Sequence, residues 1–186
     1  MPELLYQAFS LVCGQSGEHM WSPGSVLLPC CQRCVGLYVG AVIAALLHLS
    51  LRPRLSGRFL EIHGLFLLLM VPFGFHWLPH GPAWRAITGV LFGFGVVTFL
   101  WLVPASQWTH RTRGPRAAWG YALGLVLTLA LLPVLTESGD RRAAWALAGL
   151  AVAGALSLAA LVVANVALGL AGLTRFCRRV ASPAGP

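Results

Sequence analysis

The sequence predicts an all-α integral membrane bundle of about five transmembrane helices. Hydrophobic residues make up 58% of the 186 residues and charged residues only 10%, where a soluble domain has roughly 25% charged residues. The mean hydropathy is +0.77, and five long apolar runs are separated by short segments that carry arginine. The net charge of +8 comes from those arginines, so it indicates membrane topology and argues against a nucleic-acid-binding surface.

The apolar runs define the expected helices in order. At about 20 residues for each crossing, the spans are Val35–Leu51, Phe59–Leu78, Ala86–Ala105, Ala117–Thr136 and a fifth within Ala143–Leu173. The first span is short unless it begins near Cys31. The fifth is too long for one upright span, so it is expected to tilt or to emerge into the interface.

These spans divide the chain into four parts. Residues 1–34 are expected to form an N-terminal interfacial segment with the cysteine motif, and residues 35–105 a three-helix membrane core. Residues 106–175 supply two further transmembrane helices. Residues 176–186 are expected to be a basic, disordered tail.

Arginine placement predicts the orientation of this multi-pass protein. Nine arginines follow the first, third and fifth spans, and four lie on the other side. The nine are Arg52, Arg54, Arg58, Arg111, Arg113, Arg116, Arg175, Arg178 and Arg179, and the four are Arg33, Arg85, Arg141 and Arg142. The excess predicts that the N-terminus lies outside the cell membrane and the C-terminus in the cytoplasm.

Small residues recur four positions apart in three spans. The pairs are Gly36 and Gly40, Gly89 and Gly93, and Gly120 and Gly124. This spacing lets helix backbones approach closely in lipid. It predicts packing within the bundle, and the same faces could join two copies in a homo-oligomer.

The chemistry concentrates at the start of the first span, in Cys31-Gln-Arg-Cys34. On a helix Cys31, Cys34 and Tyr38 share one face, and the upstream segment with Cys13 and Gln15 could fold back over it. Three thiols at one point could hold a zinc or copper ion, or two could cycle between dithiol and disulfide. A static disulfide or simple packing is the third interpretation. An arginine between the two cysteines, Arg33, is expected to lower their pKa.

Two function classes follow from these thiols: a metal-binding membrane protein, or a thiol oxidoreductase that exchanges electrons with a protein or a lipid-soluble quinone. A purely structural role would make the cysteines expendable. The spans lack the midplane charges of an ion relay, which argues against transport. No aromatic-lined quinone site can be recognised in the sequence, which argues against redox chemistry. The prediction therefore leans towards metal or thiol binding without catalysis.

Other polar residues are expected to support this site or the bundle. Arg85, at the outer start of the third span, is expected near the Cys31–Cys34 end. His76 and His80 could complete a Cys/His metal shell. Glu61 could belong to a functional site, or its carboxylate could simply extend to water or pair with Arg58. Asn165 is expected to donate a hydrogen bond between helices.

Several of these residues form a pattern: Cys13-Gly-Gln15, then Pro29-Cys-Cys-Gln-Arg-Cys-Val-Gly-Leu-Tyr-Val-Gly40, then Arg85-Ala-Ile-Thr-Gly89 with Gly93. Over roughly residues 13 to 105 the chain resembles a family of small prokaryotic membrane proteins, domain of unknown function 2085 (DUF2085). The resemblance implies a helical membrane domain without established activity, in the prokaryotic inner membrane. It supports a shared site or fold role for Cys13, Cys31, Arg33, Cys34, Gly36, Tyr38, Gly40, Arg85 and Gly89. The family typically has Cys-His-Gln at 13–15 and an aspartate near Glu61, so this chain lacks the imidazole beside Cys13.

Overall fold

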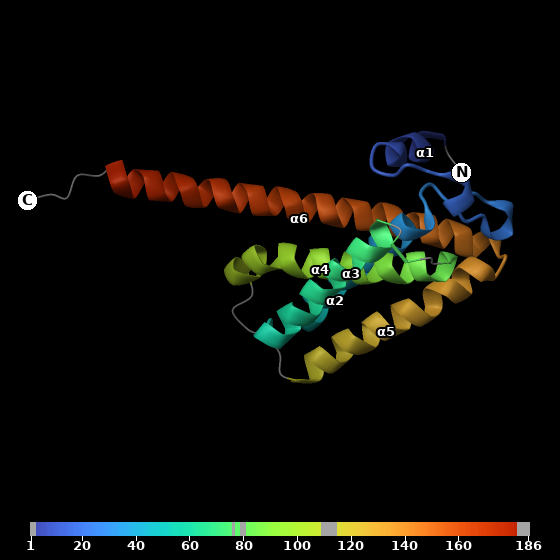
Figure 1. Ribbon diagram of the computed structural model, residues 1–186. Coiled ribbons are helices and arrows are strands. Elements are labelled where there is room, and N and C mark those ends of the chain that lie inside the picture. The colour runs from blue at the N-terminus through green and yellow to red at the C-terminus, as the bar shows by residue number, and fades with distance from the viewer. Residues whose placement is uncertain (1–2, 76, 79–80, 109–114, 182–186) are drawn as a thin grey trace, which may run out of the picture.

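The computed structural model describes residues 3–75, 77–78, 81–108 and 115–181 (Figure 1). Its described part contains five helices long and apolar enough to cross a membrane. They are α2 (Gln32–Leu51), α3 (Gly57–Gly74), α4 (Pro82–Trp108), α5 (Pro115–Glu137) and α6 (Arg141–Ala181); the short α1 (Glu3–Ser10) and two 3-10 turns, Gly17–His19 and Pro23–Ser25, precede them. The predicted all-α membrane bundle is confirmed.

Helices α2 and α4 form the centre of the bundle and run in the same direction. Gly36 and Gly40 of α2 face the backbone of Ala86 and Val90, and Gly89 and Gly93 of α4 face the backbone of α2. A Cβ atom at any of these four glycines would lie within 3.0 Å of a backbone oxygen of the facing helix. The two glycine pairs therefore pack inside the monomer, where backbone contact replaces side-chain interdigitation.

The other helices pack around this pair in different ways. Gly154 of α6 lies against the backbone of Tyr38, a close approach that the sequence did not single out. The nearest atoms to Gly120 and Gly124 of α5 belong to flexible leucine side chains of α2. Asn165 Nδ2 donates to the carbonyl of Leu100 in α4 at 2.7 Å, which confirms the predicted hydrogen bond between helices.

Apolar side chains cover the outer surfaces of α3 and α5. Large exposed examples are Leu65, Leu68, Leu123, Val126 and Leu131. An apolar exterior on helices of this length fits lipid rather than water. The bundle is thus built for a bilayer.

Several predicted helix boundaries differ from the structure, and three of them have a clear local cause. Helix α2 begins at Gln32 because Cys31 is extended and serves as its N-cap, which gives the first span its full length. Helix α3 ends at Gly74 instead of Leu78, since Pro72 lacks an N–H and Gly74 is a weak helix former. The predicted tail is helical up to Ala181, because Ala, Leu and Arg favour helix; residues 182–186 lie outside the described part.

Candidate functional site

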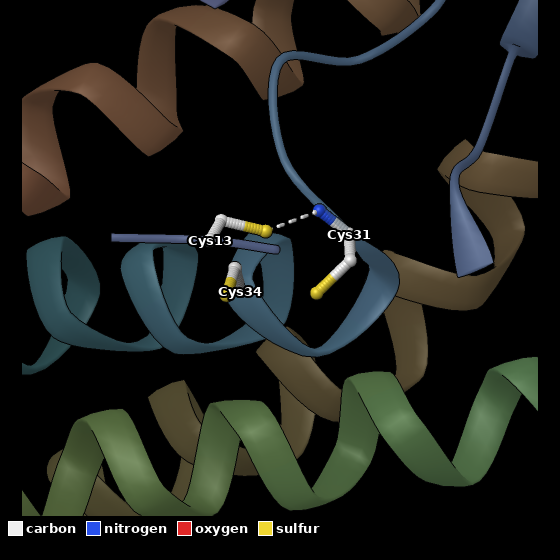
Figure 2. Close-up of side chains that lie close together, drawn as sticks. All are labelled: Cys13, Cys31 and Cys34. Atoms are coloured by element: carbon white, nitrogen blue, oxygen red, sulfur yellow. Dashed lines mark hydrogen bonds between the residues drawn. The ribbon is translucent and has the colours of Figure 1, made fainter. Parts of the chain in front are cut away.

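Three thiols meet at the N-terminal end of α2 (Figure 2). Cys31 caps the helix, Cys34 lies in its first turn, and Cys13 comes from the segment after α1. Their sulfur atoms all lie within 4.8 Å of one another, with Cys13 buried and the other two partly exposed. The chain therefore brings together the three cysteines that the sequence grouped, although Cys13 and Cys31 are 18 positions apart.

Hydrogen bonds converge on the sulfur of Cys13. The backbone N–H of Cys31 donates to it at 3.2 Å. Hydrogen bonds from the thiols of Cys31 and Cys34 lower the pKa of Cys13 far below its ordinary value, with smaller contributions from the backbone of Cys31 and Gln15, while burial opposes the shift. The lowered pKa favours the thiolate of Cys13, the form that binds metals and attacks disulfides.

Gln15 fixes the loop that carries Cys13. Its side-chain Nε2 donates to the carbonyls of Tyr6 at 2.7 Å and Pro29 at 2.8 Å. These two bonds join α1 to the segment that precedes α2. Its backbone lies in the left-handed region, at φ 44°. Gln15, which the sequence predicted to support the site, therefore links the two segments that supply the thiols.

Helix α1 is held against α2 by an aromatic pair. The rings of Phe9 and Tyr38 meet edge to face, with centroids 5.3 Å apart, and both residues are buried. The N–H of Cys13 donates to the carbonyl of Phe9 at 2.9 Å. The position of the Cys13 sulfur consequently depends on the docking of α1.

Two arginines lie at this end of the bundle and hydrogen-bond to neighbouring segments. Arg33 donates through Nη2 to the carbonyl of Phe73 at the end of α3, at 2.8 Å. Arg85 lies one residue before Ala86, which packs on Gly36, and its guanidinium donates to Nδ1 of His19. These arginines tie neighbouring segments to the ends of α2 and α4.

The remaining sequence candidates are dispersed. Cys30 is completely buried, which raises the pKa of its thiol, and Cys177 is exposed near the far end of α6. Glu61 is exposed on α3. His76 and His80 lie outside the described residues.

A second polar cluster, which sequence reasoning missed as a unit, joins four helices at the other end of the bundle. His48 Nε2 lies 3.1 Å from Thr98 Oγ1, which lies 3.2 Å from the hydroxyl of Tyr121. That hydroxyl lies 3.1 Å from His63 Nε2, and His63 Nδ1 donates to the carbonyl of Phe59 at 2.7 Å. With neutral imidazoles every group donates to the next, in the order His48, Thr98, Tyr121, His63. The only signal in the sequence was a histidine within each of two apolar runs.

Replacing Gln15 by glycine is expected to weaken metal binding at the thiols by about tenfold, as for other residues that orient a ligand. Glycine adopts the left-handed conformation freely, so the loop keeps its backbone while both side-chain hydrogen bonds disappear. Titration of the purified variant with Cu(I) against a competing chelator gives the affinity. Ser25→Gly, at another left-handed position, is the matched control, and equal affinities for both variants would remove Gln15 from the site.

The fold and these contacts define a helical multi-pass membrane protein with a three-cysteine cluster at one end. Residues 13–99 match the family described as predicted membrane protein (DUF2085), which confirms the resemblance seen in the cysteine and glycine pattern. No match was found among curated proteins or solved structures.

Proposed function

We propose that this protein binds one soft metal ion through Cys13, Cys31 and Cys34. The observation that carries the proposal is the convergence of three sulfur atoms within 4.8 Å. Three sulfurs each about 2.3 Å from one ion lie about 4 Å apart, a spacing that fits this cluster. Little rearrangement is needed to close the ligands around an ion.

The ligand set favours Cu(I). Thiolates select soft ions such as Cu(I) and also bind Zn²⁺, but a structural zinc site has four protein ligands. The cluster among the described residues has three, Cys13, Cys31 and Cys34, with no histidine or carboxylate in the group. Three thiolates complete a trigonal Cu(I) site, whereas zinc would require a fourth ligand from outside this cluster.

The surroundings suit an anionic thiolate site. Cys31 and Cys34 lie at the N-terminus of α2, where the helix dipole stabilises negative charge. Both are partly exposed, so an ion can enter from the aqueous side without crossing the bundle. The excess of arginines at the opposite end supports an orientation with this site outside a prokaryotic cytoplasmic membrane.

Thiol–disulfide exchange is the second candidate, favoured by the low pKa of Cys13. Its thiolate could attack a disulfide in a substrate protein, form a mixed disulfide and release one thiolate. A second thiol, from Cys31 or Cys34, would then resolve it, so that the chain gains one disulfide and the substrate is reduced to a dithiol. The same three residues would serve either chemistry.

Metal and thiol analysis of one preparation distinguishes these functions. The protein is purified anaerobically without chelator or reductant, its metal content is measured by mass spectrometry, and free thiols are counted after unfolding. We expect about one copper ion for each chain and, once metal is removed, all five cysteines as thiols. A metal-free protein with one disulfide would favour exchange. A metal-free protein with five thiols that neither binds added Cu(I) nor reduces an added disulfide would contradict both.

A further inference from the structure

A cavity of about 310 Å³ opens at the end of the bundle opposite the thiols. It lies between the turn that joins α2 to α3 and the last turns of α4. Its lining residues are His48, Arg52, Pro53, Arg54, Leu55, Trp101, Leu102, Ala105 and Ser106. One wall therefore carries two guanidinium groups, and the other is mainly apolar.

Backbone geometry places Arg52 and Arg54 on the same short turn. Pro53 disfavours helix at the residue before it, and Arg52 ends α2 in the left-handed conformation, at φ 50° and ψ 57°. Its N–H donates to the carbonyl of His48 at 3.2 Å. Such a conformation costs a non-glycine residue energy and often marks a functional position.

The opposite wall is rigid and mostly apolar. Trp101 stacks on His48, with ring centroids 5.7 Å apart and planes at 19°. The imidazole of His48 is also hydrogen-bonded to the hydroxyl of Thr98. Leu102 extends this apolar wall, and Leu55 adds apolar surface on the side of the arginines. Among the nine lining residues there is no carboxylate to neutralise the arginines.

We propose that this cavity binds the phosphate group of an anionic phospholipid. Arginine presents a planar set of donors that matches phosphate oxygens, and basic pockets at the ends of transmembrane helices recognise lipid head groups. Arg52 and Arg54 contact the phosphate, while the wall of Trp101 and Leu102 receives the glycerol and upper acyl chain. Arg58 and Arg116, which begin the neighbouring helices, do not line the cavity.

Lipid binding to the purified full-length protein tests this site. Native mass spectrometry in detergent measures retention of phosphatidylglycerol and phosphatidylcholine, and calorimetry measures inorganic phosphate. We expect one preferred site for phosphatidylglycerol, weakened at least about tenfold in Arg52→Gln/Arg54→Gln, since each cation near a membrane surface contributes appreciably to binding. Arg58→Gln/Arg116→Gln removes the same charge at the same end and should retain the site.

Folding and ligand source are checked separately. Arg52→Gly suits the left-handed conformation and should fold at least as well as the parent, so its loss of lipid reports the side chain. Saturable binding of inorganic phosphate that depends on Arg52 and Arg54, without preference for anionic lipid, would support a phosphate site for a soluble ligand. Equal lipid binding by the parent and both double variants, or equal losses in the two double variants, would overturn the proposal.

Discussion

Replacing Cys31 by serine is expected to abolish stoichiometric metal binding, with a loss of affinity of about 100-fold or more. Even residues that only orient a metal ligand contribute about 10- to 100-fold, and a hydroxyl is a poor ligand for a soft ion. Cys13→Ser and Cys34→Ser should give the same loss, because the three sulfurs form one cluster. Cu(I) titration of each purified variant measures the effect.

The chain contains its own controls for this series. Cys30→Ser changes a buried thiol that lies next in sequence to the site, and Cys177→Ser changes an exposed thiol of α6. Both variants should bind metal as the parent does. If all five variants retain metal alike, the cysteines are packing residues and the proposed function is wrong.

Gly89→Leu is expected to destabilise the bundle by about 3 kcal/mol or more, at the upper end for overpacking. The new Cβ would meet the backbone carbonyl of Arg33, which cannot rotate away as a side chain can. Helices α2 and α4 would have to separate over the length of their contact. The midpoint of unfolding in detergent, followed by circular dichroism, should fall sharply, and metal binding should weaken because α2 carries two of the thiols.

The same substitution at an open position supplies the comparison. No atom lies within 4 Å of a Cβ built at Gly169 of α6, so Gly169→Leu should leave the unfolding midpoint nearly unchanged. Gly120→Leu should be intermediate, since Leu51 in α2 can move. Similar midpoints for Gly89→Leu and Gly169→Leu would show that backbone contact between α2 and α4 is not needed.

The sequence predicted the membrane class and the five spans, because long apolar runs have few alternative structures. Helix ends were harder, since they depend on local capping. The first span was predicted to begin at Val35, yet α2 begins at Gln32 with Cys31 as its N-cap. Helix α3 ends at Gly74 although the apolar run continues. Hydropathy averages over such single-residue effects.

The sequence predicted which three cysteines form the cluster, but not which residues hold them in place. Cys31 and Cys34 are the N-cap and the third residue of α2, so the start of the helix brings them together. The position of Cys13 depends on the docking of α1 and on Gln15. Arg33 was expected beside the thiols, yet it bonds the end of α3. Side chains of this length can reach several neighbours, and tertiary packing decides among them.

The polar chain from His48 to His63 shows a stronger limit of sequence reasoning. Its four members come from α2, α4, α5 and α3, so no local spacing connects them. Glu61, two residues before His63, was a candidate site residue because it is charged, but its side chain is exposed. A network between helices becomes visible only when the helices are placed.

The length of α6 gives its last arginines a different environment from Arg52. The 20 residues of α2 span about 30 Å, the thickness of the hydrocarbon core, and Asn165 of α6 bonds Leu100 of α4 near the far end of that core. Helix α6 continues from there for more than a dozen residues, beyond the other helices (Figure 1). At 1.5 Å per residue this places Arg178 and Arg179 roughly 20 Å further out. Exposed apolar residues line this extension, among them Val166, Leu170 and Leu173, so α6 carries a lipid-compatible surface beyond the ends of the other helices.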